Sequence, residues 1–376
     1  MIRDILVRRI ELKFDKEIFY IDLDNLDKNQ KENLKQFWKI LLEYINKEEN
    51  ENMKKELFDL FGLDNPDVIL LRFLRARKWN IQLALEQLIQ TIQWRIEVNI
   101  QDILFHGENQ IEYEEILSGK TFFICSDKFG RPINFVSVKD HIKGQFPSES
   151  TEKLTILSME LGRKLLKYPN ESVTVLFDMD GFAMKNMDYQ HVKFLINLLQ
   201  NYYPESLGLA LIVNAPWLFN SCWYLIKSWL DPVVQQKIHF IKNLDDLNQF
   251  IDRNYLPKRL NGNYPDFNYI SPNDQEKEML VKIHQDYQGK IQAKENHYQS
   301  GIHFFEITSK WIEKTSNENF HERNQVQQDL KFSYEKLIPY ISSLTHYHRN
   351  GFIHEPIFNR THENIQKQDQ EEKTFF

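Results

Sequence analysis

The chain has 376 residues, of which 41% are hydrophobic and 13% are aromatic, a composition that excludes a disordered chain. A single core stops growing at roughly 250–300 residues, so we expect two or three folding units. The formal net charge of −7 provides no basic field of the kind that binds nucleic acids, so we predict no nucleic-acid partner.

The N-terminal part of the chain is predicted to be mostly helical. Apolar residues recur at helical spacing in 28–44, 68–74 and 81–94, and Asn80 precedes the last of these segments as an N-cap. We assign residues 1–105 to an N-terminal helical domain.

The middle of the chain, 106–265, is predicted to be an α/β domain. Segments 121–124 and 133–138 show the period of two that is typical of strands, and the turn-forming sequence 127–132 between them predicts a hairpin. The expected elements that follow are a helix at 152–166, a strand at 172–177, a helix at about 189–201 and a strand at 210–214. This alternation predicts an α/β unit with a largely buried sheet.

The most apolar region of the chain, 207–230, is too interrupted to span a bilayer. Asn214, Pro216 and Lys227 break its run of apolar residues. Its second half, 217–230, is apolar on nearly every side. A helix there is either wholly buried or faces an apolar partner that is not always present.

The C-terminal part of the chain is polar and charged, and we assign residues 266–376 to a helical extension. Helical runs are predicted at 275–294, 302–314 and 325–338. This extension is the third of the expected folding units.

The sequence Asp178-Met179-Asp180-Gly181, at the end of an apolar strand, resembles the catalytic motif of haloacid dehalogenase-type phosphatases. Those enzymes use the first carboxylate as a nucleophile and the second as a general acid. They also need a Thr after the Gly, where this chain has Phe182, and an acidic Mg²⁺ motif after another apolar strand, for which no segment matches. We therefore favour a structural turn, and keep a phosphatase that uses Asp178 and Asp180 as an alternative.

Other patterns that resemble enzyme or metal sites are incomplete. Cys125 and Arg131 have the spacing of a tyrosine-phosphatase loop, but they lie in the predicted hairpin and enclose an acidic residue. The segment 118–121 ends like a phosphate-binding P-loop that lacks its first glycine, and His346 and His348 lack a third metal ligand. We therefore predict no enzymatic activity, no metal and no cofactor.

A set of motifs that mean little one at a time occurs in one order along the chain. They are Leu-Leu-Arg-Phe-Leu-Arg-Ala-Arg-Lys-Trp (70–79), Asp-Lys-Phe-Gly-Arg-Pro (127–132), Asn-Tyr-Tyr-Pro-Glu (201–205), Asn-Ala-Pro-Trp (214–217), Leu-Asp-Pro-Val (230–233), Lys-Ile (237–238) and Leu-Pro-Lys-Arg-Leu-Asn-Gly (256–262). Together they resemble the CRAL-TRIO lipid-transfer family, in particular its fungal phosphatidylinositol-transfer type. The resemblance covers roughly residues 28–265.

The resemblance implies an α/β fold with a mixed, largely parallel sheet and a lipid pocket that a gate helix closes. A small helical bundle of the family's N-terminal type, from about residue 28, would precede it, and the helical extension would follow. Segment 217–230 would be the gate, closed over lipid in solution and open at a membrane. The gate residues would be Trp217, Phe219, Trp223, Tyr224, Ile226, Trp229 and Leu230.

The resemblance also implies a head-group site. Lys78, Glu205 and Lys237 match positions that help to hold a phosphoinositol head group, since lysines attract a phosphodiester and a carboxylate accepts hydrogen bonds from inositol hydroxyls. Two departures change the pocket: Val234 replaces a Thr, and the segment 173–175 replaces a Ser-x-Thr pattern that helps to bind choline lipids. The more apolar wall leaves a sterol-like or isoprenoid cargo as an alternative.

We therefore predict a protein that binds a single lipid, phosphatidylinositol or a related one, and transfers or presents it between membranes. It would be a cytoplasmic monomer that meets intracellular membranes peripherally and transiently, since two cysteines make no disulfide framework and indicate a reducing compartment. A lipid-sensing scaffold for a lipid kinase, acting through the C-terminal helices, is an alternative.

Overall fold

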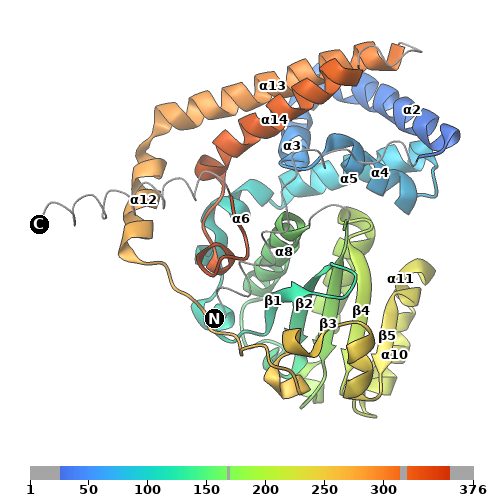
Figure 1. The fold of residues 1–376 in the computed structure, drawn as a ribbon, viewed down its shortest axis with the longest axis vertical. Helices are drawn as coiled ribbons and strands as arrows, with labels where there is room; N and C mark the ends of the chain where they lie inside the picture. Colours follow the sequence, from blue (N-terminus) through green and yellow to red (C-terminus); the bar gives the residue numbers. More distant parts are fainter. Residues whose placement is uncertain (1–25, 167–169, 314–319, 356–376) are drawn as a thin grey trace, which may run out of the picture.

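The structure, a computed structural model of the chain, describes residues 26–166, 170–313 and 320–355. A layer of helices lies on one end of a layer that combines a sheet with helices (Figure 1). The helical layer combines helices from the N-terminal part of the described chain with long helices from its C-terminal part, whereas the sheet comes from the middle of the chain (Figure 1). The predicted first and third domains include residues 1–25 and 356–376, which lie outside the described residues.

The N-terminal helices predicted from apolar spacing are present, together with shorter ones that the spacing does not indicate. As predicted, the Asn80 side chain caps a helix, because it accepts a hydrogen bond from the backbone N–H of Leu83 at 3.0 Å. Apolar spacing does not predict helix α3, because the charged residues Lys54 and Glu56 lie on its buried side. The helices are α2 (Lys28–Ile45), α3 (Glu51–Phe61), α4 (Pro66–Ala76), α5 (Ile81–Glu97), α6 (Ile100–His106) and α7 (Tyr113–Leu117).

The described residues form a five-stranded sheet with the strand order β1-β2-β3-β4-β5. The predicted hairpin is the antiparallel pair β1–β2, whereas β2 to β5 run parallel, so the mixed, largely parallel sheet is confirmed. Strand β5 is an addition, because its four residues are too few for a period of two to stand out. The strands are β1 (Thr121–Ser126), β2 (Pro132–Ser137), β3 (Val173–Asp178), β4 (Leu207–Val213) and β5 (Ile238–Ile241).

A buried carboxylate holds the turn of the hairpin. Asp127 accepts hydrogen bonds from the backbone N–H groups of Phe129 and Arg131, both at 2.9 Å. The hydroxyl of Thr174 donates to it at 2.6 Å, and the Arg131 guanidinium pairs with it at 2.8 Å. Because Arg131 is committed to this turn, the spacing between Cys125 and Arg131 does not create a phosphate-binding loop.

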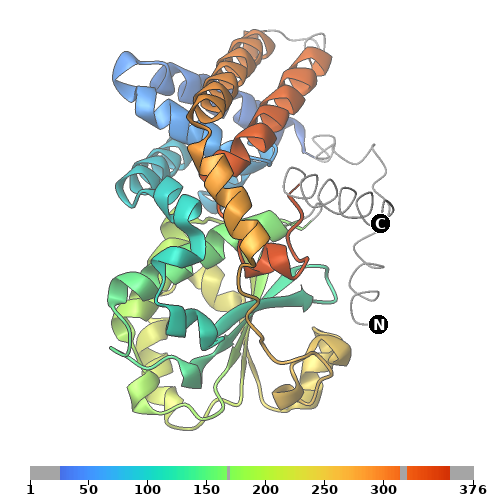
Figure 2. The same ribbon diagram turned by 90° about the vertical axis from the view of Figure 1, so that its left-hand side faces the viewer.

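The two faces of the sheet have different covers (Figure 2). Residues 244–260, which form 3₁₀-helical turns, pack buried leucine and isoleucine side chains against one face. Helices cover the other face and enclose a cavity. The helices of this layer are α8 (Ser148–Leu165), α9 (Tyr189–Asn197), α10 (Phe219–Lys227) and α11 (Pro232–Gln236).

The C-terminal helices are α12 (Asp274–Gln285), α13 (Tyr287–Glu313), α14 (Phe320–Ile341) and α15 (His346–Arg349). The predicted runs 275–294 and 302–314 are wrong in their boundaries, because the chain breaks at Asp286 and α13 then continues without interruption. The Asp286 carboxylate accepts hydrogen bonds from the backbone N–H of Gly289 at 2.9 Å and from the hydroxyl of Tyr340 at 2.7 Å. This cap starts α13 at a point where the apolar spacing shows no boundary.

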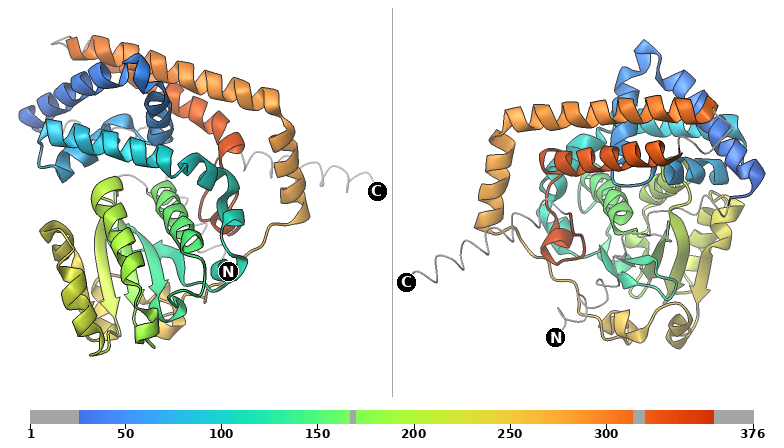
Figure 3. Two further views of the ribbon diagram at one scale, coloured as in Figure 1. Left: turned by 180° about the vertical axis from the view of Figure 1, so that it is seen from behind. Right: turned by 45° about the horizontal axis from the view of Figure 1, so that its top comes forward.

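Helices α13 and α14 lie against the N-terminal helices (Figure 3). Phe304 and Trp311 of α13 and Leu330 of α14 are buried in the same core as Trp38 of α2. The extension therefore completes the core of the helical layer, and it adds a small cluster of its own in which Ala293, Leu337 and Ile341 are buried.

A buried ion pair joins α14 to α4 in this core. Arg323 donates to the carboxylate of Asp67 at 2.6 and 2.7 Å, and the indole N–H of Trp38 donates to the same carboxylate at 2.6 Å. Asp67 is 1% exposed and Arg323 is fully buried, with its guanidinium over the rings of Phe304 and Trp311. These partners compensate the guanidinium for the loss of water.

We expect Arg323→Met to lower the free energy of unfolding by about 3–5 kcal/mol, because the Asp67 carboxylate is left buried without its charged partner. Urea-induced unfolding measures this change. Lys336→Met, at an exposed position of α14, is the matched control and should change the free energy by less than about 0.5 kcal/mol. Equal stability of Arg323→Met and the wild type would show that the ion pair does not hold α14 in place.

Candidate functional site

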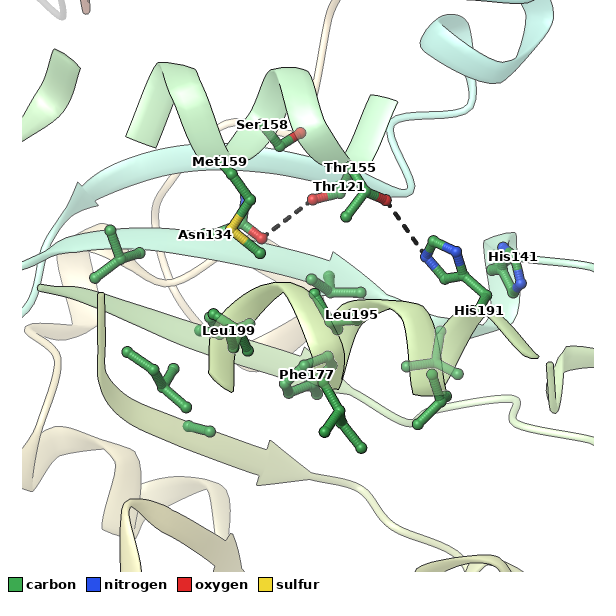
Figure 4. Close-up of a pocket in the computed structure, with 18 of the residues that line it drawn as sticks. Thr121, Asn134, His141, Thr155, Ser158, Met159, Phe177, His191, Leu195 and Leu199 are labelled. Carbon is green, nitrogen blue, oxygen red and sulfur yellow. Dashed lines mark hydrogen bonds between the residues drawn. The ribbon is translucent and has the colours of Figure 1, made fainter. Parts of the chain in front are cut away.

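A cavity of about 310 Å³ lies between the sheet and helices α8, α9 and α10 (Figure 4). Alternation along β3 explains one part of its wall, since Val173, Val175 and Phe177 face the cavity. The hydroxyl of Thr174 points to the opposite face of the sheet, where it binds Asp127. Most other side chains that line the cavity are apolar as well, so the site is a hydrophobic pocket inside the α/β layer.

Valines line this wall at positions where the resemblance to CRAL-TRIO proteins implies residues with hydroxyl groups. Val173 and Val175 occupy the two outer positions of the Ser-x-Thr pattern, and both face the cavity. Val234, which replaces a Thr, lines it too. Methyl groups therefore take the place of three hydroxyls, in agreement with the more apolar wall expected from the sequence.

Helix α10 forms the part of the predicted gate that closes the cavity. Phe219, Trp223 and Ile226 repeat at helical spacing along its inner side and line the cavity, as does Leu230 beyond the helix end. The helix has nine residues and is shorter than the predicted segment 217–230, because it begins at Phe219 and ends at Lys227, and residues 228–231 separate it from α11.

The remaining gate residues do not line the cavity. Trp217 and Tyr224 are 83% and 84% exposed. The Trp229 ring packs on Tyr189 of α9, with ring centroids 5.9 Å apart, and the Lys193 ammonium lies 4.7 Å from its centroid. The segment predicted as a gate thus has an apolar inner side and exposed aromatic rings outside. No helix in the described part of the chain is both long and apolar enough to cross a membrane.

Two of the three predicted head-group residues lie together. Lys237 Nζ is 3.4 Å from Glu205 Oε2, and both side chains are partly exposed. Their chain neighbours Ser206 and Ile238 line the cavity, so the pair lies at the cavity edge. Lys78 is exposed after α4 and is not among the residues that line the cavity. The roles of all three residues in binding a head group stay predictions.

A buried charge network lies just before Glu205 in the chain. The Tyr203 hydroxyl donates to Glu160 of α8 at 2.7 Å. Arg95 of α5 donates to Glu160 at 2.8 Å and to Glu56 of α3 at 2.6 Å. Burial alone would raise the pKa of Glu160, but the guanidinium of Arg95 lowers that pKa to about 2. The network ties the helical layer to α8 and to the chain that leads into β4.

Polar side chains gather along one side of the cavity (Figure 4). His141, after β2, stacks on His191 of α9 with ring centroids 5.4 Å apart, and Thr155 Oγ1 of α8 lies 3.4 Å from His191 Nε2. Burial, with the charges of His141 and Lys120 adding to it, lowers the pKa of His191 to about 4. Burial also lowers the pKa of His141. Sequence patterns do not single out these residues, and their only signal is a polar side chain within an apolar segment.

Asp178, the residue that suggested a phosphatase, has a structural role. Its carboxylate accepts hydrogen bonds from the Asn214 amide at 2.9 Å and from the backbone N–H of Asp180 at 3.1 Å, and it pairs with Arg259 at 3.3 Å. Asp178 is buried, whereas the Asp180 side chain is 67% exposed. The two carboxylates do not converge on one site, and the phosphatase alternative has no support.

The other patterns singled out in the sequence are also engaged in packing. Lys120, the lysine of the segment that ends like a P-loop, is buried and pairs with Glu115. His348 Nε2 lies 3.2 Å from Glu355. Within the described ranges, no group of three or more His, Cys, Asp or Glu side chains is arranged to hold a metal ion.

Comparison with known proteins gives a consistent result. The model of the CRAL/TRIO domain matches residues 117–262, and that of the CRAL/TRIO N-terminal domain matches residues 33–90. A CRAL-TRIO domain-containing protein of Schizosaccharomyces pombe is 36% identical over 337 residues, 87% of this chain and 74% of the relative. The phosphatidylinositol transfer protein CSR1 of Eremothecium gossypii is 36% identical over 315 residues, 80% of this chain and 71% of the relative. The crystal structure of Sfh5 has a TM-score of 0.49 at 20% identity, over 60% of this chain and 84% of its own.

We expect the free energy of unfolding to fall as the pH drops from 6.5 to about 4, in part because of His191. The folded pKa of this residue lies below its unfolded value of 6.5, so the unfolded state binds more protons in this window. The stabilisation is therefore complete above pH 6.5 and is lost toward pH 4. His191→Gln should reduce the loss by about 1–2 kcal/mol, measured by urea unfolding across this pH range.

His239→Gln, which removes an exposed imidazole, is the control for this measurement. An identical loss of stability in His191→Gln and the wild type would contradict a buried, uncharged His191 in the folded chain.

Proposed function

Because this chain belongs to the CRAL/TRIO family, we propose that it holds one lipid molecule in the cavity behind α10 and transfers it between membranes, with phosphatidylinositol as the cargo. The observation that carries the proposal is the apolar cavity of about 310 Å³, within the roughly 300–1,000 Å³ range of ligand pockets. Support for the cargo comes from the relative named as a phosphatidylinositol transfer protein.

An apolar cavity solves the physical problem of carrying a lipid through water. Two acyl chains with about 30 methylene groups would cost about 24 kcal/mol to expose, at about 0.8 kcal/mol for each group. Moving the chains from a bilayer into the cavity exchanges one apolar environment for another, so this cost nearly cancels. The polar contacts of the head group then decide which lipid is bound.

We assign the head group to the edge of the cavity at Glu205 and Lys237. The Lys237 ammonium would attract the phosphodiester, and the Glu205 carboxylate would accept hydrogen bonds from inositol hydroxyls. Their separation of 3.4 Å and partial exposure support this assignment, because both side chains are reachable from outside while their neighbours line the cavity. Lys78 would add a second positive charge from the helical layer.

The outer side of the gate would meet the membrane. Large apolar side chains are exposed here on three neighbouring elements, namely Trp217, Tyr224 and Leu225 at α10, Val233 of α11 and Phe240 of β5. Trp and Tyr rings favour the boundary between lipid and water. With a net charge of −7, the contact would be peripheral and transient, and the chain would be a cytoplasmic monomer between contacts.

We expect Lys237→Ala and Glu205→Gln each to lower the transfer of labelled phosphatidylinositol between vesicles by about tenfold or more. Each substitution removes a charged hydrogen-bonding partner of the head group, which contributes about 1.5–3 kcal/mol. Lys242→Ala, at an exposed lysine just after β5, is the matched control. Wild-type transfer in both variants would remove the head-group assignment.

We expect the double substitution Trp217→Ala and Tyr224→Ala to slow transfer by about tenfold through weaker vesicle binding, since two rings of about 1 kcal/mol or more each are lost from the interface. The amount of lipid bound per chain should stay the same, because neither side chain lines the cavity. Vesicle co-sedimentation and transfer rates measure the two effects. Tyr287→Ala, at a 69% exposed tyrosine of α13, is the control. Unchanged vesicle binding in the double variant would argue against α10 as the contact.

A further inference from the structure

A second, smaller cavity of about 40 Å³ lies beside the first. Thr121 of β1 and Ser158 of α8, both drawn in Figure 4, line the two cavities, and Leu154 of α8 does so as well. A residue that lines both cavities leaves only its own side chain between them. The two cavities are therefore separated by single side chains, of which those of Ser158 and Thr121 are small.

Aromatic rings close the second cavity on the wall that the two cavities do not share. Phe267 and Tyr269 precede α12, whereas His346 and Tyr347 belong to α15. The ring centroid of His346 lies 5.2 Å from that of Phe267, 5.8 Å from that of Tyr269 and 5.3 Å from that of Tyr347. Two of these four rings come from residues 342–355, which follow α14 and which we call the C-terminal strap.

The strap also contacts the wall of the first cavity. The Tyr347 hydroxyl accepts a hydrogen bond from the backbone N–H of Phe123 at 3.0 Å, and the two ring centroids are 5.5 Å apart. Phe123 lines the first cavity and lies in β1, an edge strand of the sheet in the described part of the chain. At the other edge, Phe240 of β5 packs on Trp223 of α10 with ring centroids 5.0 Å apart. The strap and α10 thus lie at opposite edges of the sheet (Figure 1).

Polar contacts fasten the strap to other elements. Arg349 donates to Glu276 of α12 at 3.0 Å, and the Lys164 ammonium of α8 lies 2.6 Å from Glu355. Most of the buried side chains of the strap are polar, namely Ser342, Ser343, Thr345, His346 and Glu355, with Leu344 and Ile353 as the apolar ones. Water can solvate polar groups again when they are exposed, so such a contact detaches at a lower cost than an apolar one of the same size.

We propose that the C-terminal strap is a second closure of the first cavity, at the sheet edge opposite to α10, and that its release opens a route between β1 and α8. The route would pass Tyr347 first and Ser158 next. A partner that pulls on the C-terminal helices would then empty the cavity without moving α10. The inference goes beyond the proposed function, because it concerns access to the cavity whatever the cavity holds.

The test measures how fast a thiol inside the purified full-length chain reacts with a small methanethiosulfonate reagent. Ser158→Cys places this thiol where the two cavities meet. Mass analysis of peptides gives its rate separately from those of the two native cysteines. Cys222, which is buried in α10, reports movement of that helix or general unfolding in the same molecules. With the strap in place, the introduced thiol should react slowly.

Two substitutions in the Ser158→Cys chain loosen the strap. Tyr347→Ala removes the ring and the hydroxyl at β1, and Arg349→Met removes the contact with α12. Each should speed the reaction of the introduced thiol by about tenfold and leave the rate at Cys222 unchanged. His354→Ala, at an exposed position of the strap, is the matched control and should leave both rates unchanged.

A selective increase in only one of the two variants would support the second closure and show which contact holds it. A faster reaction at both thiols in each variant would point to α10 or to general unfolding and would overturn the proposal. An unchanged rate in both variants, or a fast reaction with the strap intact, would overturn it too. The readout involves no lipid, so its outcome does not depend on whether the chain transfers phosphatidylinositol.

Discussion

A hollow inside a protein is costly, and much of this structure compensates for one. The side chains around the hollow of about 310 Å³ lack part of the dispersion contacts that a filled core would give them. The face of the sheet that bounds the hollow therefore contributes less than a packed face. The opposite face, covered by residues 244–260, and the dense core of the helical layer have to supply the stability.

The lack of packing on the cavity side also explains the buried charged side chains that surround α8. One side of this helix borders the cavity, with Thr155, Ser158 and Gly162 among the residues that line it, and has few atoms to pack against there. Its position is held by charged side chains that bind other elements, since Glu160 binds Arg95 and Tyr203 and Arg163 binds the backbone oxygen of Leu60 at 2.7 Å. A buried charge is costly without its partner, so this arrangement permits one position of α8 and rejects others. The cavity wall and the chain before Glu205 are thereby fixed together.

The sequence allows prediction of features whose cause is local. The hairpin and the alternation of strands and helices appear as periods within short segments, and the segment predicted as a gate appears as an apolar run. The partner of Arg323 is 256 residues away at Asp67, so no local pattern shows that an arginine in a polar helix is buried. For the same reason the extension looks separate in the sequence although its helices complete a shared core. The division of the gate into inner and outer residues depends on where α10 begins and ends, which its uniform apolar character conceals.

Binding of a lipid and the position of α10 would depend on each other, because both fill the same cavity. Without a lipid, the inner side chains of α10, such as Phe219 and Trp223, border empty space and lose dispersion contacts. A bound lipid restores those contacts and stabilises the closed arrangement by mass action. The nine-residue α10 is short and carries exposed side chains on its outer side, so moving it, as the proposed function requires, would cost less than moving the long helices of the other layer. Under the proposed function, a membrane that both removes the lipid and receives Trp217 would act on the same equilibrium twice, and the bilayer surface would then be the place where the cavity opens.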